Sequence, residues 1–227
     1  MRCLLRLLIL VVIVGALAVV GAAWAGVVQV PVVSALVGMD KPADLGAATP
    51  DVAAYEAWVK KYGLVHTSPD ANYTLSSHHE FSGSYALDAI IPEGVILATR
   101  TLRGNAPGIH DVTVKFHDGS ATAAAFFDVG PYGYPVSGPV KVDFRVTVTG
   151  PRAVTVSIDS LVFGRIGVPA EIVAKAQDAL NGYLATRLAG IDGLQIDSLS
   201  FVEGGVQFKG TLPKTFGSDP PAPGALP

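Results

Sequence analysis

Hydrophobic and polar residues alternate without interruption from residue 140 to residue 149. The apolar members of this run are Val140, Val142, Phe144, Val146 and Val148. A two-residue period of this kind predicts a strand with one face in a core and the other in solvent. Past a turn at residues 150–152 the alternation resumes over residues 154–158, which predicts a second, antiparallel strand beside the first.

The hydrophobic period changes from two to three or four after Gly167. The apolar positions of this segment are Ile172, Ala176, Ala179, Leu180, Tyr183, Leu184 and Leu188. Their spacing predicts a long helix over residues 168–188. Pro169 suits the first helical turn, Glu171 suits the positive end of the helix, and Gly190 is placed to end it.

Weaker patterns predict the remaining elements. Helices are expected over residues 51–62 and 92–102, each followed by a glycine. The Asp118-Gly119 pair lies between alternating segments and predicts a β-hairpin around it. A last pair of strands is expected over residues 194–202 and 206–212. Helices mixed with antiparallel strands make the predicted fold class α+β.

The N-terminal part of the chain carries no charged residue between Leu7 and Met39. Its most apolar stretch runs from Leu7 to Trp24, whose indole suits a membrane interface, and about 20 apolar residues suffice to cross a bilayer. Two arginines precede the run and the next basic residue is Lys41. The positive-inside bias therefore predicts a single-pass anchor in the cell membrane, with a cytoplasmic N-terminus and an extracytoplasmic domain.

A cleaved signal peptide is the alternative interpretation of the same segment. Ala23-Trp24-Ala25 resembles a cleavage site with small residues on either side of a variable one. The apolar stretch continues past this site, which favours the uncleaved anchor. Under either interpretation the folded part lies outside the cytoplasm.

These patterns divide the chain into four parts. Residues 1–40 hold the membrane anchor, or signal peptide, and the juxtamembrane segment. Residues 41–63 form a connector and a short helix, and residues 64–213 form the extracytoplasmic α+β domain. Residues 214–227 are rich in proline and are expected to be a disordered tail.

Composition and motifs argue against most chemistry. The net charge of -3 and the absence of clustered Lys and Arg exclude nucleic acid as the expected partner. His78, His79 and Glu80 are the only concentration of metal-type ligands, but adjacent residues of a strand point to opposite faces, so no metal site is expected. No nucleophile motif or phosphate-binding glycine loop occurs, so we expect no cofactor and no catalysis, with an envelope hydrolase as a minor alternative.

Four short motifs carry a resemblance to a known family. They are residues 41–46 after the anchor, 108–112 before the Asp118-Gly119 turn, 164–169 at the start of the long helix, and 205–213 at the end. With the order of elements, they resemble membrane-anchored bacterial proteins of unknown function that have a YpmS-like or LmeA-like domain. That domain is akin to half of a tubular lipid-binding (TULIP-type) module, and the resemblance covers nearly all of the extracytoplasmic part.

The resemblance implies one long helix wrapped by a strongly curved antiparallel sheet, with one or two shorter helices. It also implies an apolar channel between helix and sheet that in some relatives is thought to take a lipid acyl chain. The expected channel residues are Ile172, Ala176, Leu180 and Leu184 on the helix and Val142, Phe144 and Val146 on the strand. The small residues Ala121, Ala123 and Ala125 on a neighbouring strand could leave room for a ligand.

A filled core is the alternative to a channel. An amphipathic helix on an amphipathic sheet is the usual way for an α+β domain to bury apolar surface. The protein would then be a structural or interaction module that docks an envelope protein partner through an exposed strand edge or the loop of Tyr132 and Tyr134. The two hypotheses differ in whether the core has room for a ligand.

Overall fold

The computed structural model describes residues 39–66, 79–103, 108–128 and 137–218. The predicted anchor, including Leu7 and Trp24, lies outside the described residues, and so do His78 and the Tyr132 and Tyr134 loop. Within the described ranges, no helix combines the length and the hydropathy needed to cross a bilayer.

The largest sheet is built from consecutive antiparallel strands. Its order is β4 (Ile109–His117), β5 (Ser120–Asp128), β6 (Ser137–Gly150), β7 (Ala153–Phe163) and β8 (Ile166–Gly167). The tight turn between β4 and β5 contains Gly119 at φ 77°, a value that glycine adopts readily. Both hairpins predicted from the alternating segments are confirmed. We call these five strands the main sheet.

The strand register gives the main sheet one apolar face. Val142 of β6 lies opposite Ala123 of β5 and Leu161 of β7. A shift in the β6–β7 register at Asp143 and Phe144 adds one residue to β7. This bulge keeps Leu161 on the apolar face although its number breaks the alternation.

Two smaller sheets complete the described strands. One has the order β3 (Tyr85–Pro92), β10 (Gly205–Leu212) and β9 (Gln195–Val202), and all its pairs are antiparallel. The other has the order β1 (Val65–His66), β11 (Thr215–Ser218) and β2 (His79–Ser82), with β1 and β11 parallel. The disordered tail was therefore predicted to begin too early, because residues 215–218 pair with two other strands.

The helices of the described part are α3 (Val52–Tyr62), α4 (Glu93–Arg103) and α5 (Ala170–Ala189). Asp51 caps α3 by accepting a 2.8 Å hydrogen bond from the Ala54 amide, and Gly63 ends it in a left-handed conformation. The predicted helices are confirmed within one or two residues at each end. The α+β class with antiparallel sheets is confirmed as well.

The core lies where the three-stranded sheet of β3, β10 and β9 packs on part of the main sheet. One buried cluster consists of Leu87, Leu194, Ile196 and Phe208, and a second of Phe116, Ala121 and Phe201. The ring of Phe201 in β9 lies 5.3 Å from that of Phe116 and 5.6 Å from that of Phe144 in the main sheet. Aromatic contacts at this spacing add to the burial itself.

Candidate functional site

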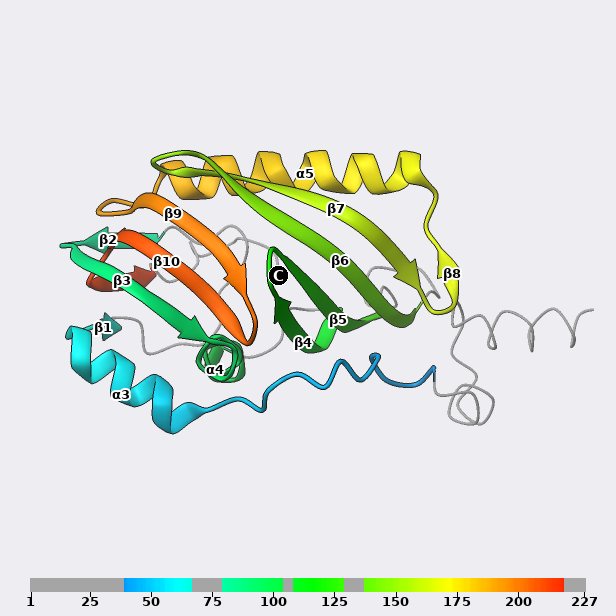
Figure 1. The fold of residues 1–227 in the computed structure, drawn as a ribbon, viewed down its shortest axis with the longest axis horizontal. Helices are drawn as coiled ribbons and strands as arrows, with labels where there is room; N and C mark the ends of the chain where they lie inside the picture. Colours follow the sequence, from blue (N-terminus) through cyan, green and yellow to red (C-terminus); the bar gives the residue numbers. More distant parts are fainter. Residues whose placement is uncertain (1–38, 67–78, 104–107, 129–136, 219–227) are drawn as a thin grey trace, which may run out of the picture.

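Helix α5 lies along the edge of the main sheet beside β7 (Figure 1). Its side chains bond directly to the backbone of that strand. The Val156 amide donates to Asn181 Oδ1 at 2.8 Å, and Asn181 Nδ2 donates to the Val156 carbonyl at 3.0 Å. The Ile158 amide donates to Gln177 Oε1 at 2.8 Å. We call this set of hydrogen bonds the amide ladder.

The amide ladder can form because one turn of the helix and two residues of the strand cover nearly the same length. Four residues of a helix rise about 6 Å, and two residues of a strand rise about 6.6 Å. Gln177 and Asn181 therefore match the amides of Ile158 and Val156, with the helix antiparallel to the strand. Because a side-chain amide both donates and accepts, it can substitute for a neighbouring strand and cover an edge.

The amide ladder selects a different face of α5 from the one predicted to meet the sheet. No residue of α5 is fully buried. Ile172 is 55% exposed and Leu180 37% exposed, and Ala176 is exposed as well. Of the four predicted channel residues on the helix, only Leu184 is half-buried. Hydrophobic periodicity missed this, because the contacting stripe is centred on polar residues.

The two sides of α5 that flank the amide ladder are buried to different extents. Val173 and Leu184 on one flank are half-buried, whereas Asp178 and Ala185 on the other are exposed. Leu188 packs against the core cluster together with Val148 and Val154 of the apolar face. The half-buried flank is therefore the one nearer the rest of the fold, and at about 100° per residue it continues outward through apolar positions. These positions are Ile172, Ala176, Leu180 and Tyr183.

The predicted strand residues Val142, Phe144 and Val146 are all half-buried. Phe144 and Val146 pack against the cluster that contains Phe201. Val142 belongs to neither of the core clusters formed by the described residues.

Three neighbours of Val142 in the strand register also belong to neither of these core clusters. They are Val140, Leu161 and Phe163. We call these four residues together with β8 the open end of the main sheet. The small residue Ala123 faces Val142 there and is half-buried, whereas Ala121, two residues earlier in β5, is 1% exposed. Any room that alanines leave for a ligand is therefore at the open end.

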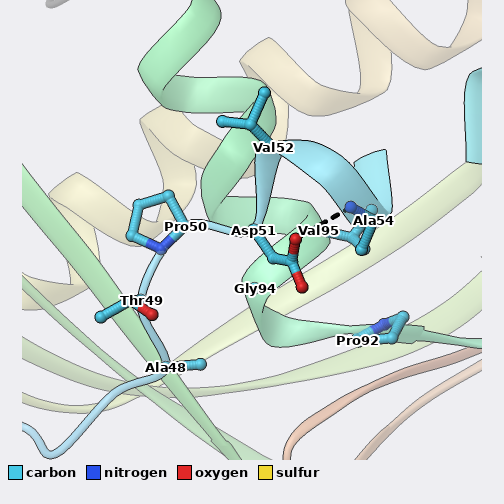
Figure 2. A pocket seen from close by; sticks show the side chains of 9 residues that line it. All are labelled: Ala48, Thr49, Pro50, Asp51, Val52, Ala54, Pro92, Gly94 and Val95. Atoms are coloured by element: carbon cyan, nitrogen blue, oxygen red, sulfur yellow. Dashed lines mark hydrogen bonds between the residues drawn. The ribbon is translucent and has the colours of Figure 1, made fainter. Parts of the chain in front are cut away.

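A depression of about 610 Å³ lies elsewhere, where the connector meets the first turns of α3 and α4 (Figure 2). Its lining residues are Ala48, Thr49, Pro50, Asp51, Val52, Ala54, Pro92, Gly94 and Val95. The carboxylate of Asp51 is already used as the cap of α3. The Asp51 amide also donates to the Gly94 carbonyl at 2.9 Å. A Cβ at Gly94 would lie 3.0 Å from the Thr49 carbonyl oxygen, so a residue without a side chain suits this contact.

Glu93, at the start of α4, holds this junction together. The residue is 2% exposed, and its carboxylate accepts hydrogen bonds from the amides of Ala48 and Phe116, the latter at 3.1 Å. Its own amide donates to the Gly204 carbonyl at 2.9 Å. Both helix N-termini at the depression thus already have a carboxylate beside them, which disfavours an anion as ligand. The depression is better explained as a structural junction.

The sequence pattern gave Glu93 no role beyond its place at the start of the helix expected over residues 92–102. A glutamate in the first turn of a helix is common, because its charge favours that end. The partners of Glu93 lie 45 residues before it and 23 after it in the chain. No local pattern could therefore have signalled that its carboxylate is buried.

The outer, polar face of the main sheet holds a cross-strand carboxylate. Asp143 accepts hydrogen bonds from Thr122 at 2.7 Å and from Ser160 at 2.5 Å. Burial by itself raises the pKa of Asp143, but the hydroxyl donors Ser160 and Thr122, together with the charges of Lys141 and His117, outweigh it and hold the pKa below its usual value. A carboxylate with a lowered pKa is a poor general base at neutral pH. The hydrogen bonds of Asp143 instead link β6 to its two neighbouring strands, β5 and β7.

The exposed pair Arg145 and Asp159 lies on the same face. The two side chains form a bidentate ion pair. Hydrogen bonds from Arg145 lower the pKa of Asp159. Because both groups are largely in solvent, this pair contributes little to stability.

Two histidines of the described part each lie beside a single carboxylate. His110 contacts Asp111 at 2.8 Å and stacks on Phe126, and His117 lies 3.4 Å from Glu203. No group of three metal-type ligands occurs among the residues that the structure describes. The prediction about His78, His79 and Glu80 remains a prediction, because the side chains concerned are not among those described.

Comparisons of the chain with models of protein families, with curated proteins and with solved structures found no match.

Proposed function

We propose that this chain is a membrane-anchored, extracytoplasmic protein of the bacterial cell envelope whose domain binds an apolar chain, such as a lipid acyl chain. The ligand would lie between the apolar stripe of α5 and the open end of the main sheet. One observation carries this proposal. The longest described helix turns an apolar stripe outward beside a sheet face that the described core clusters leave half-exposed.

The energetics of such a site are those of apolar burial. Removing apolar surface from water is worth roughly 25 cal/mol per Å², or about 0.8 kcal/mol for each methylene group. Ile172 and Leu180 on the helix and Val142 and Leu161 on the sheet keep exposed apolar area that an acyl chain would cover. The exposed groups of these four side chains are aliphatic, and this favours a hydrocarbon as the ligand.

The hydrogen bonds of Asp143, Asp51 and Glu93 support a role without catalysis. Thr122 and Ser160 both donate to Asp143, and Asp51 and Glu93 are occupied by backbone amides. Each group is used to hold elements together, which favours binding as the function. The run without charge from Leu7 to Met39 supports a single-pass anchor with the domain outside the cytoplasm.

Native mass spectrometry with lipid extraction, on the full chain purified in mild detergent, tests this proposal. We expect co-purified lipid, and we expect Ala176→Trp to remove it, because a bulky ring would occupy the space beside the apolar stripe. Ala185→Trp is the matched control. Nine residues make about two and a half helical turns, so the same bulk then lies on the opposite side of α5.

Two results would contradict the proposal. One is a protein without lipid that takes up none from added phospholipid, which would favour the interaction module instead. The other is equal loss of lipid in both variants while the domain stays folded, because the site would then lie away from the apolar stripe.

A further inference from the structure

The connector leads from the predicted anchor to the domain, and its C-terminal residues are bonded to the first turn of α4. The Ala48 amide bonds to the carboxylate of Glu93, and the Asp51 amide to the Gly94 carbonyl. Gly46 donates to the side chain of Asp44 at 2.9 Å, which forms a local turn. These bonds tie residues 48–51 to the domain and give residues 44–46 a local turn.

The connector runs along the long axis of the molecule. Figure 1 shows it extending from α3, at one end, toward the end where β8 and the first turn of α5 lie. Its first described residue is Met39, which is also the last residue of the uncharged run. If that run spans a bilayer, the membrane surface begins at this end of the domain.

Two of the most exposed apolar side chains lie at the same end. Ile166 of β8 is 49% exposed, and Ile172 in the first turn of α5 is 55% exposed. Large aliphatic side chains in water are unfavourable by roughly 25 cal/mol per Å², and they gain that free energy on entering the acyl boundary of a bilayer. Since they lie at the same end of the molecule as the start of the connector, a membrane at that end is one they can enter.

We propose that the domain rests with its β8 end on the outer surface of the bilayer and inserts Ile166 and Ile172 into the interface. This inference rests on the anchor and the extracytoplasmic domain of the proposed function. It adds an orientation, since the open end of the main sheet then adjoins the lipid. An acyl chain could pass from the bilayer to the apolar stripe of α5 without crossing water.

Spin labels measure this orientation directly. The full chain with Cys3→Ser is reconstituted into vesicles of phosphatidylethanolamine and phosphatidylglycerol. A single label is then attached at Ile166→Cys or Ile172→Cys. The matched control is Ile90→Cys, since Ile90 of β3 is 53% exposed and lies in the other half of the molecule (Figure 1). All three changes are at exposed positions and leave the core clusters intact.

We expect the labels at positions 166 and 172 to collide often with oxygen and rarely with a water-soluble nickel complex, and the label at position 90 to show the opposite. Labels at positions 166 and 172 that behave like the one at position 90 would overturn the inference. Native mass spectrometry of the unlabelled chain in mild detergent separates this result from the proposed function. Water-exposed labels in a protein that carries lipid refute only the orientation, and buried labels in a protein without bound lipid refute only the lipid site.

Discussion

The two ends of the main sheet have the same alternating sequence pattern but are covered differently. At the packed end, Phe116, Ala121 and Phe144 meet Phe201 of β9, and the first two are at most 5% exposed. At the open end, Val142 and Leu161 stay half-buried and belong to neither described core cluster. Alternation therefore identifies an apolar face but does not determine what covers it.

The two ends of the main sheet differ in the elements that pack on them and not in the types of residue that they contain. Both ends offer valine and phenylalanine on one face of the same strands. The packed end receives β9 and α4, whereas the open end is flanked by α5, which lies beside the sheet and turns its apolar stripe outward. If this distinction is correct, the same type of substitution should lower the free energy of unfolding by different amounts at the two ends.

Phe208→Ala and Phe163→Ala test the comparison most strongly. Phe208 is 5% exposed in the core cluster, so its truncation should cost about 4 kcal/mol of unfolding free energy. Phe163 is half-buried at the open end, and the same change there should cost about 1 kcal/mol. Urea unfolding of the full chain in detergent measures both. Equal losses would mean that the open end is as well packed as the core.

Glu93→Ala should destabilise the packed end by about 3 kcal/mol, because the amides of Ala48 and Phe116 lose a buried carboxylate acceptor. Glu93→Gln keeps the shape and one acceptor oxygen, so a smaller loss is expected. Urea unfolding gives the free energy, and hydrogen exchange at the Ala48 amide shows whether the connector has come loose. A Glu93→Ala variant with unchanged exchange at Ala48 would contradict the role given to this carboxylate.

Asn181→Ala should cost about 2 kcal/mol, because Val156 is 7% exposed and would lose both hydrogen bonds to the amide ladder. Gln177→Ala removes a single hydrogen bond and should cost about 1 kcal/mol. Amide exchange at Val156 and Ile158 should rise in the corresponding variant only. Unchanged exchange in both would show that α5 is held to β7 by something other than the amide ladder.

Asp143→Asn should have one of the smaller effects, about 1 kcal/mol at neutral pH, through the bonds of Asp143 to Thr122 and Ser160. The folded pKa of Asp143 lies below the usual 3.8, so its charge stabilises the fold above that pH and ceases to do so as the pH falls through the lower, folded value. The stability difference between the two proteins should therefore shrink as the pH falls from neutral through 3.8 and then through the lower, folded pKa of Asp143. A difference independent of pH would exclude the charge as its source.

Local patterns were sufficient to predict the described helices and three hairpins, but not β8 or β11. Strict alternation predicted β6 and β7, the Asp118-Gly119 turn predicted the hairpin of β4 and β5, and apolar residues at helical spacing predicted α5. These signals are short in range, because strand pleat and helical turn repeat within four residues. The α+β class followed from them.

Contacts between distant residues decided the rest. Glu93 reaches Ala48 and Phe116, and Asn181 reaches Val156, across 23 to 45 residues of chain. The pairing of residues 215–218 with β1 and β2 is of the same kind. The sequence by itself determined which faces are apolar, but only the tertiary structure decided which of them are covered, because burial depends on partners that are brought together only when the whole chain folds.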